Sequence, residues 1–237
     1  MIYRFGLILT VLACMMVSLS ADEWKSGIDW PRPEVVEGTE PTTTPPPEGA
    51  VVLIDGKSMD AWNNGQNWIL KDGFAEVKGG SVTSKQEFGS CKLHIEWASP
   101  EVAKGDGQGR GNSGLFFFDK YELQILDSYQ NETYYDGQCG SIYKQRPPLK
   151  NVCRKPGEWN SYDVDFTAPV FEDGKLVKPA YITVYQNGVL IQDNYEIQGS
   201  TFWHQPPVYE PHGPKGRLQL QDHGDPVRFR NMWVVEK

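Results

Sequence analysis

The chain has 237 residues, of which 24 are glycine, 17 are proline and 12% are aromatic. This composition favours many short strands joined by turns, and no long segment repeats apolar residues at helical spacing, so the sequence predicts an all-β fold. The formal net charge of −8 at pH 7 argues against nucleic acid or an anionic membrane surface as a partner. It is compatible with a neutral sugar as the substrate.

Residues 1–21 have the features of a secretory signal peptide. Arg4 supplies one positive charge, residues 7–17 are an apolar run, and Ala21 ends a group of small residues before Asp22. The run is too short for a stable membrane span, so we expect cleavage after Ala21 and export to the periplasm, the cell surface or the medium. An alternative interpretation makes Cys14 the lipid-anchored cysteine of a lipoprotein signal.

Residues 22–49 are predicted to form a loosely attached tail or linker, because they contain the Pro/Thr-rich run 42–47, which is extended and has no core of its own. The folded domain is expected to span residues 50–237. Asp72-Gly73 and Asn187-Gly188 separate pairs of β-like runs, the pattern of tight hairpins. About a dozen strands without an internal repeat predict two antiparallel sheets packed as a sandwich.

The stretch 121–127 carries the clearest chemical pattern. In a strand, Glu122 and Gln124 would share one face while the residues between them point into a core. A β-bulge at Leu126 would bring Asp127 to that same face. Two carboxylates facing one sugar bond are the requirement of glycoside chemistry, in which one acts as nucleophile or base and the other as acid. The competing interpretation is an edge strand with solvated carboxylates.

The sequence gives little indication of a cofactor. No paired Cys-x-x-Cys or Cys-His spacing predicts zinc, and no metal ligands are assigned. Asp222 and Asp225 could hold Ca²⁺, although no complete ligand loop is visible. In an oxidising compartment Cys139 and Cys153, which bracket a Pro-rich loop, could be bridged or free.

A set of short motifs in order along residues 51–235 resembles the 3-keto-disaccharide hydrolase family. The motifs are 53–56 (LIDG) with Trp62, 112–114 (NSG), 122–127 (ELQILD), 140–143 (GSIY), 157–160 (GEWN), 187–188 (NG), 220–224 (LQDHG) and 229–231 (FRN). The resemblance implies a concanavalin A-like jelly-roll sandwich, related in fold to family 16 glucanases. In those enzymes a bulged Glu-x-Asp-x-x-Glu strand holds the catalytic carboxylates. Glu122, Gln124 and Asp127 fall on the three corresponding places, with Gln for the middle Asp and Asp for the last Glu.

The resemblance further implies cleavage of the glycosidic bond in a sugar that is already oxidised at carbon 3. The ketone acidifies the C2 proton, so that a base can remove it and the C1 oxygen can leave. Such a site needs a base, a donor to the leaving oxygen and a partner for the enolate oxygen. The candidates are Glu122 or His223 as base, Asp127 as acid, and Arg228, Arg230 or Lys144 as enolate partner. Asn112, Gln124, Asn160 and Gln221 would bind hydroxyl groups, and Tyr143 or Trp159 would stack on the sugar ring.

Two other functions remain open on the sequence alone. One is a non-catalytic carbohydrate-binding module on the same sandwich, and the other is a structural or adhesion domain carried on the Pro/Thr tract. The fold does not decide between them. Convergent acids on one sheet face would favour the enzyme, and a flat aromatic face would favour the module. We expect Glu122, Gln124, His223 and Arg228 to surround one pocket.

Overall fold

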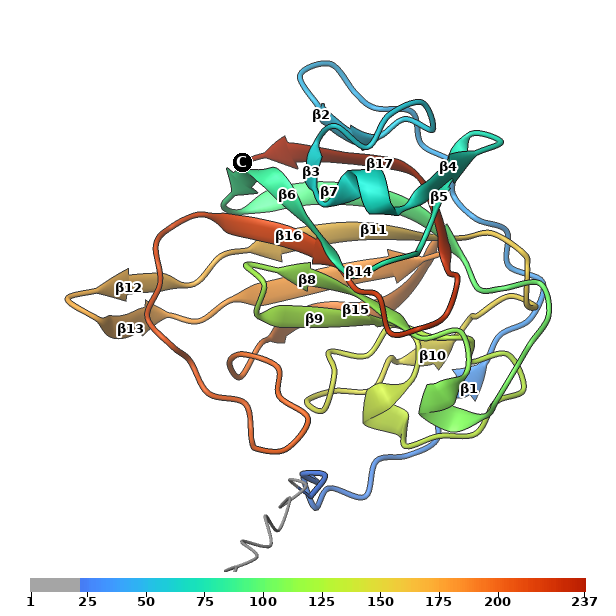
Figure 1. Cartoon of the computed structure of the whole chain (residues 1–237). Coiled ribbons are helices and arrows are strands. Elements are labelled where there is room, and N and C mark those ends of the chain that lie inside the picture. Colours follow the sequence, from blue (N-terminus) through green and yellow to red (C-terminus); the bar gives the residue numbers. More distant parts are fainter. Residues whose placement is uncertain (1–21) are drawn as a thin grey trace, which may run out of the picture.

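The computed structural model describes residues 22–237, and the predicted signal peptide lies outside these residues. Strands dominate the described chain, with three single turns of 3-10 helix (Figure 1). The elements are β1 (Glu34–Val35), β2 (Val51–Ile54), β3 (Trp62–Asn63), η1 (Gly65–Asn67), β4 (Ile69–Lys71), β5 (Phe74–Glu76), β6 (Val82–Phe88), β7 (Cys91–Ala98), η2 (Gly107–Gly109), β8 (Ser113–Phe117), β9 (Tyr121–Ile125), η3 (Tyr135–Gly137), β10 (Lys150–Asn151), β11 (Asn160–Thr167), β12 (Val170–Glu172), β13 (Lys175–Lys178), β14 (Tyr181–Gln186), β15 (Val189–Glu196), β16 (Gly216–Leu220) and β17 (Arg228–Glu236).

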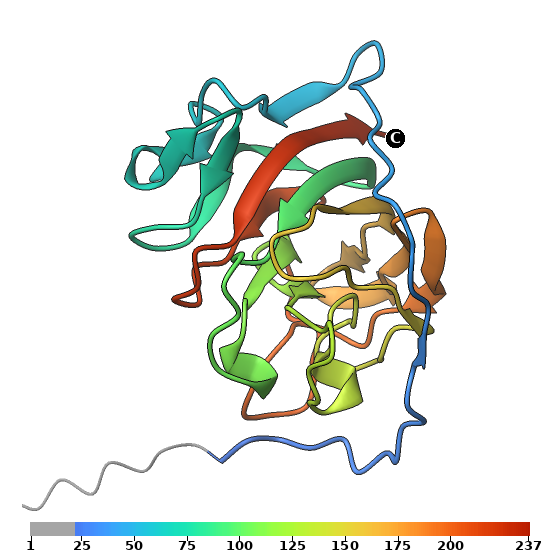
Figure 2. The same cartoon turned by 90° about the vertical axis from the view of Figure 1, so that its right-hand side faces the viewer.

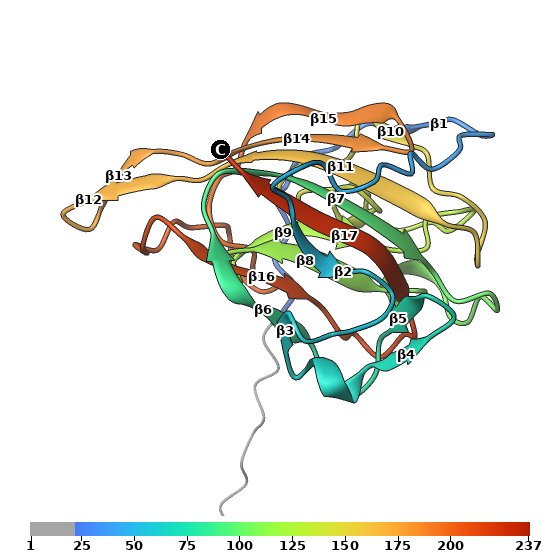
Figure 3. The ribbon, with the colours of Figure 1, turned by 90° about the horizontal axis from the view of Figure 1, so that it is seen from above.

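Two antiparallel sheets face each other, which confirms the predicted all-β sandwich. One sheet has the strand order β15-β14-β11-β7-β17-β5-β4, with β2 also paired to β17, and the other has the order β3-β6-β16-β8-β9. In Figure 1 the five-stranded sheet lies in front of the eight-stranded sheet, and Figure 3 shows the two layers from above. Both expected hairpins form, β4–β5 around Asp72-Gly73 and β14–β15 around Asn187-Gly188.

The core lies between the two sheets and is filled by alternate residues of their strands. Phe117 of β8 stacks on Phe166 of β11 with ring centroids 4.4 Å apart, so the aromatic rings join the layers directly. Such pairs contribute packing energy in addition to the large apolar area that they bury. Leu123 and Ile125 of β9 are fully buried in the same core. Their alternation therefore directs the intervening residues of β9 to the outer face of the five-stranded sheet.

The regular strand β9 ends at Ile125, and β9 pairs with β8 without a register shift. Ile125 and Leu126 are both buried in the core, but Leu126 lies beyond the paired strand, so the β8–β9 pairing contains no β-bulge at this residue. Beyond the end of β9, the Asp127 N–H donates to the Arg110 carbonyl at 3.2 Å, so the chain stays attached to the segment that precedes β8.

The N-terminal segment, residues 22–49, is extended, as its composition predicts, but it is fastened along the surface of the domain (Figure 2). Strand β1 pairs in parallel with β10, and the Thr42 N–H donates to Ser161 Oγ at 2.8 Å. The side chains of Asn231 and Trp233 both donate to the Thr44 carbonyl. The segment is therefore held at several points rather than hanging free, and the boundary at residue 50 stays a prediction.

Two further structural facts bear on the expectations from sequence. Within residues 22–237, no helix is both long enough and apolar enough to cross a membrane. Cys139 and Cys153 are not bridged: both are free thiols, and the Cys139 sulfur lies 3.0 Å from the Tyr162 hydroxyl.

Candidate active site

The outer face of the five-stranded sheet carries Glu122 and Gln124. On the neighbouring strand β8, Phe116 pairs with Glu122 and Gly114 pairs with Gln124. Gly114 leaves room where any other residue would place a side chain, since a Cβ there would lie 2.7 Å from Glu122 Oε1. The Glu122 carboxyl group consequently lies over the Gly114 backbone, between the two strands.

Glu122 is a buried acid without a partner. The residue is only 6% exposed. Burial alone raises the pKa of its carboxyl group from 4.5 to about 8. Among the described residues, no hydrogen bond or ion pair reaches its carboxyl group, whereas its backbone N–H donates to Thr201 Oγ1 at 3.1 Å. A buried carboxyl group whose pKa lies near neutral pH is the environment expected of a general acid or base.

Two glutamines, Gln124 and Gln221, lie on segments next to Glu122. Gln124 Nε2 donates to Gln108 Oε1 at 3.0 Å, and the Gln221 N–H donates to the Gly114 carbonyl at 3.0 Å. The side-chain carbonyl oxygens of Gln124 and Gln221 are both buried and have no donor. Buried acceptors are normally satisfied, so these two oxygens are exceptions next to Glu122. Asn112 is committed to the loop, where its Nδ2 donates to the Gln108 carbonyl at 2.8 Å.

A second polar group borders Glu122 on its other side. The Tyr143 N–H donates to the Glu122 carbonyl at 3.3 Å, which places Tyr143 beside the acid. The Tyr143 and Tyr134 hydroxyls are 2.7 Å apart. Burial raises the pKa of Tyr143 to about 12, and the neighbouring Glu122 charge also raises it, so this phenol stays protonated near neutral pH. Lys144 Nζ lies 3.6 Å from the centroid of the Tyr134 ring and forms an ion pair with Glu23.

Asp127, the expected partner of Glu122, is directed elsewhere. Its carboxylate is paired with Arg110, with 2.9 Å between Arg110 Nε and Asp127 Oδ2. Burial raises the pKa of Asp127, and Arg110 opposes that rise. Asp127 and Arg228 line a cavity of about 500 Å³ together with Asp225. Asp127 and Arg228 therefore share the lining of one cavity in which Glu122 takes no part, and a single pocket that holds both Glu122 and Arg228 stays a prediction.

Arg230 and Trp159 lie on the outer side of the eight-stranded sheet. The Arg230 guanidinium carbon is 4.0 Å from the centroid of the Trp159 ring, and its Nε is 2.7 Å from Glu96 Oε2. Burial opposes ionisation of Glu96, but hydrogen bonds from His94, Asn231 and Arg230 lower its pKa to about 2. These residues form an ionic cluster around Glu96, and the Arg230 guanidinium lies over the Trp159 ring.

The two remaining predicted residues have simple surroundings. His223 is exposed in the loop between β16 and β17. Asn160 is 1% exposed, and its Oδ1 accepts hydrogen bonds from the Arg154 N–H and from Asn187 Nδ2. Asn160 thus fixes a loop instead of offering a free amide to a ligand.

The expected calcium ligands are also committed to the backbone. The Asp222 carboxylate accepts from the N–H groups of Gly80 and Gly224, and the Asp225 carboxylate accepts from the Asn112 N–H. In the part of the chain that is described, no three His, Cys, Asp or Glu side chains are grouped as a metal site.

Sequence reasoning missed Gly114, Tyr134 and Gln108 as parts of this site. The motif 112–114 (NSG) does not by itself show which side chain its glycine faces. Only the β8–β9 register puts Gly114 beneath Glu122. Tyr134 and Gln108 reach the site from loops, for which alternation gives no prediction.

Comparisons with known proteins agree with this architecture. A family model described as a 3-keto-alpha-glucoside-1,2-lyase-like domain matches residues 49–235. A 3-keto-disaccharide hydrolase of Bacteroides thetaiotaomicron is 24% identical over 241 residues, covering 79% of this chain and 78% of that protein. A crystal structure of a candidate glycosyl hydrolase from Parabacteroides distasonis is 42% identical, with a TM-score of 0.78 over 86% of this chain and 94% of that one.

A second candidate glycosyl hydrolase from Parabacteroides distasonis shares the fold, with 22% identity and a TM-score of 0.59 over 80% of this chain and 94% of that one. The more similar relatives are thus named as a hydrolase of 3-keto-disaccharides and a candidate glycosyl hydrolase. Because the family model covers residues 49–235, the chain belongs to the 3-keto-alpha-glucoside-1,2-lyase-like domain family.

Proposed function

We propose that the protein is an exported enzyme that cleaves the glycosidic bond of 3-keto-glucosides, with Glu122 as the base that removes the C2 proton. The observation that carries the proposal is the buried, unpartnered Glu122 carboxyl group, whose pKa of about 8 suits proton abstraction near neutral pH. Gln124 and Gln221, on neighbouring segments, have buried side-chain oxygens without donors. Membership of the family and the named relative support the substrate class.

The proposed reaction is an elimination. Glu122 takes the C2 proton, and the electron pair of the C2–H bond moves into the enolate of the C3 ketone. The enolate then collapses to a C1–C2 double bond while the C1–O bond breaks and the leaving oxygen takes a proton. Addition of water across the double bond completes a net hydrolysis. Only the ketone makes the C2 proton acidic enough for a carboxylate base.

The other roles follow from what lies beside Glu122. Tyr143 is the neighbouring proton donor, because its pKa of about 12 keeps the phenol protonated and still allows it to protonate a leaving alkoxide. Lys144, rather than Arg228 or Arg230, is the cation beside the Tyr134–Tyr143 pair, and it would hold the enolate oxygen. The Gln124 and Gln221 carbonyls would accept from sugar hydroxyls.

A conventional glycosidase mechanism needs a second carboxylate at about 5–10 Å from the first, on the other side of the bond. Asp127 is the candidate for that role in the sequence, but its carboxylate is held by Arg110. The pairing of Asp127 favours elimination driven by one base over double displacement by two acids.

The test uses purified residues 22–237 with 3-keto-glucosides and their unoxidised parents, and aglycone release is measured by chromatography. Cleavage restricted to the keto-sugars, and lost in Glu122→Gln while sugar binding remains, is the expected result. Equal cleavage of ordinary glucans would indicate a normal glycosidase pair. Binding without any cleavage would indicate a carbohydrate-binding module, and activity that survives Glu122→Gln but not His223→Ala would make His223 the base.

Export has its own test, since the segment concerned lies outside residues 22–237. The intact mass of the protein that native cells secrete or release should correspond to a chain whose first residue is Asp22. A lipid-modified N-terminus at Cys14 would instead establish the anchored form, and an unprocessed chain in the cytoplasm would contradict export.

A further inference from the structure

Residues 23–24 of the N-terminal segment lie next to the part of the chain that holds Glu122. The Trp24 N–H donates to the Trp203 carbonyl at 2.9 Å. Two residues before Trp203, the Thr201 hydroxyl accepts the backbone N–H of Glu122 at 3.1 Å. A single short loop therefore links the N-terminal segment to β9 at the position of the acid.

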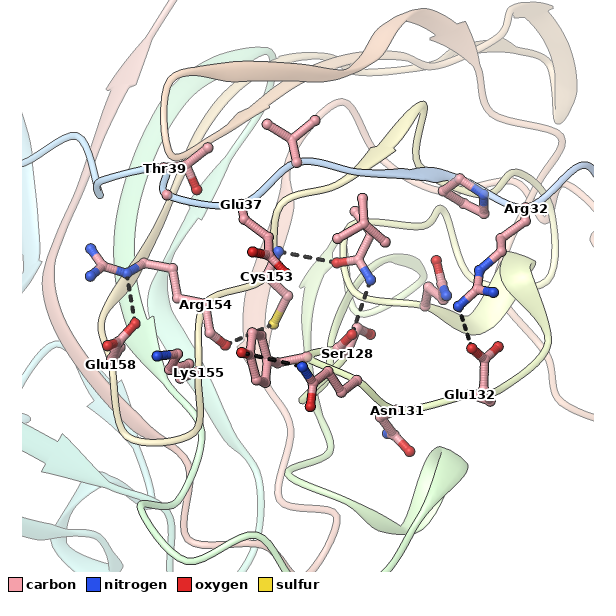
Figure 4. Close-up of a pocket in the computed structure, with 18 of the residues that line it drawn as sticks. Arg32, Glu37, Thr39, Ser128, Asn131, Glu132, Cys153, Arg154, Lys155 and Glu158 are labelled. Atoms are coloured by element: carbon pink, nitrogen blue, oxygen red, sulfur yellow. Dashed lines mark hydrogen bonds and ion pairs between the residues drawn. The ribbon is translucent and has the colours of Figure 1, made fainter.

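The same segment is fixed again farther along the chain, so its place beside this loop does not depend on one contact. Strand β1 pairs with β10. Figure 4 shows residues 32–40 along the wall of a cavity of about 550 Å³, where Arg32 is paired with Glu132. The chain between Trp24 and Arg32 is thus tethered at both of its ends.

A second segment, which follows the other edge of β9, places Tyr143 and Lys144 near the acid. An antiparallel bridge joins Leu123 to Ile142, so Tyr143 is the cross-strand neighbour of Glu122. Leu123 and Ile142 are buried in the core, which directs their neighbours to the outer face of the sheet. Lys144 follows with a φ of 63°, in the left-handed region that residues other than glycine seldom adopt.

Lys144 is a buried cation with an acidic partner from the N-terminal segment. The residue is only 3% exposed, and an ammonium left unpaired at such a site would be strongly destabilising. Among the described residues, the Glu23 carboxylate is the only group that forms an ion pair with it. Lys144 Nζ also lies 3.6 Å from the centroid of the Tyr134 ring, a favourable cation–π contact. These three residues share the lining of a cavity of about 380 Å³.

The charge of Glu23 reaches the phenol beside the acid as well. Burial, together with the charges of Glu122 and Glu23, raises the pKa of Tyr143 to about 12. The Tyr143 hydroxyl is in turn 2.7 Å from the Tyr134 hydroxyl. The acid of the N-terminal segment and the acid of β9 therefore act on the same pair of tyrosines.

We propose that Glu23 is a positioning residue of the active site, whose carboxylate holds the Lys144 ammonium against the Tyr134 ring and beside Tyr143. The inference rests on the proposed function, in which Lys144 holds the enolate oxygen. Glu23 itself touches no reacting atom and acts through Lys144. The N-terminal segment is accordingly part of the catalytic unit, in addition to being fastened to the sandwich.

A double-mutant cycle on the cleavage of a 3-keto-glucoside tests the proposal, with kcat and KM measured well below the lowest Tm of the set. Glu23→Gln keeps the size of the side chain and removes its charge. It should lower kcat about ten-fold and leave KM nearly unchanged, because the enolate forms only after substrate has bound. In the Lys144→Met background the same change should have no further effect on kcat. Glu23→Asp, which keeps the charge, should recover part of the lost rate.

The matched control is Glu34→Gln. It removes an exposed carboxylate of the same segment, which is paired with Lys150 at 3.7 Å, and it should keep the kcat of the wild type.

The outcomes distinguish a failure of this inference from a failure of the proposed function. Wild-type cleavage with an unchanged kcat in Glu23→Gln would refute the role of Glu23 alone. A higher kcat in Glu23→Gln would overturn it too, because Glu23 would then compete with the enolate for Lys144. A further loss of kcat in the Lys144→Met background would show an action that does not pass through Lys144. No cleavage by the wild type would refute the proposed function and the role of Glu23 with it.

Discussion

Replacement of Glu122 by Gln should separate the stability of the protein from its activity. The amide keeps the shape of the side chain and cannot ionise. In the folded protein burial raises the pKa of Glu122 from 4.5 to about 8, so at pH 7 the folded state binds a proton that the unfolded state has released. A group of this kind contributes most favourably to stability below pH 4.5, and that contribution is lost as the pH rises toward 8.

The magnitude follows from the interval between the unfolded-state pKa and the working pH. Between pH 4.5 and pH 7 this proton linkage lowers the free energy of unfolding of the wild type by on the order of 3 kcal/mol. The value is an upper bound, because a buried site can relax. Glu122→Gln should therefore unfold at higher denaturant concentration than the wild type at pH 7 and 8, and at nearly the same concentration at pH 4.5. The same variant should lose about 10²–10⁴-fold in the rate of keto-sugar cleavage.

Urea unfolding followed by tryptophan fluorescence at several pH values measures the effect directly. The matched control is Glu87→Gln, which makes the same chemical change at an exposed position of β6 and should show no such dependence on pH. A stability difference between wild type and Glu122→Gln that stays constant with pH would refute the inferred burial of an unpartnered acid. Destabilisation of Glu122→Gln at pH 7 would show that the charged carboxylate has a favourable partner.

Three other predictions concern the same site and its surroundings. Gly114→Ala should destabilise the protein by about 1–3 kcal/mol and reduce the rate of cleavage by more than ten-fold. The reason is that the new Cβ would lie 2.7 Å from Glu122 Oε1 and 2.8 Å from Phe116 Cε2. Unchanged kinetics would contradict the assigned position of the acid. Arg110→Met should lower the free energy of unfolding by about 3 kcal/mol, since it leaves the buried Asp127 carboxylate unpaired. A loss below 1 kcal/mol in urea unfolding would show that the pair is not buried as described. In the wild type, kcat/KM for a 3-keto-glucoside should rise about ten-fold per pH unit up to the Glu122 pKa of about 8 and then level off. A profile that falls over this range would exclude a base with that pKa.

The fold was largely predictable because its local patterns agree with its global structure. Alternation predicted β9 with Glu122 and Gln124 on one face, and Asp-Gly and Asn-Gly pairs predicted two hairpins that the structure contains. These features depend on neighbours in the sequence, for which strand period and turn chemistry are sufficient.

The composition of the site was only partly predictable, because it depends on which sheet each strand joins. Arg228 and Arg230 begin β17 of the eight-stranded sheet, and so they lie away from Glu122 even though their motif was part of the same family pattern. Strand β7 shows the same difficulty. His94 alternates with core residues, a pattern that favours an outward side chain, yet it is fully buried and stacked on Trp233.

The N-terminal segment was the least predictable part. A Pro/Thr-rich composition correctly indicates an extended chain, but it carries no information about where such a chain docks. The ion pair of Glu23 with Lys144 and the pairing of β1 with β10 join positions more than a hundred residues apart. Neither contact leaves a local pattern in the sequence.

The most direct test of the central claim is exchange of the C2 proton. A 3-keto-glucoside incubated with the enzyme in D₂O should yield a 3-keto-glucose product that carries deuterium at C2, and a substrate deuterated at C2 should show a primary isotope effect on cleavage. Both effects should disappear together with the activity in Glu122→Gln. Release of the aglycone with the original C2 proton fully retained, and without an isotope effect, would contradict proton abstraction by Glu122 and would require direct displacement at C1.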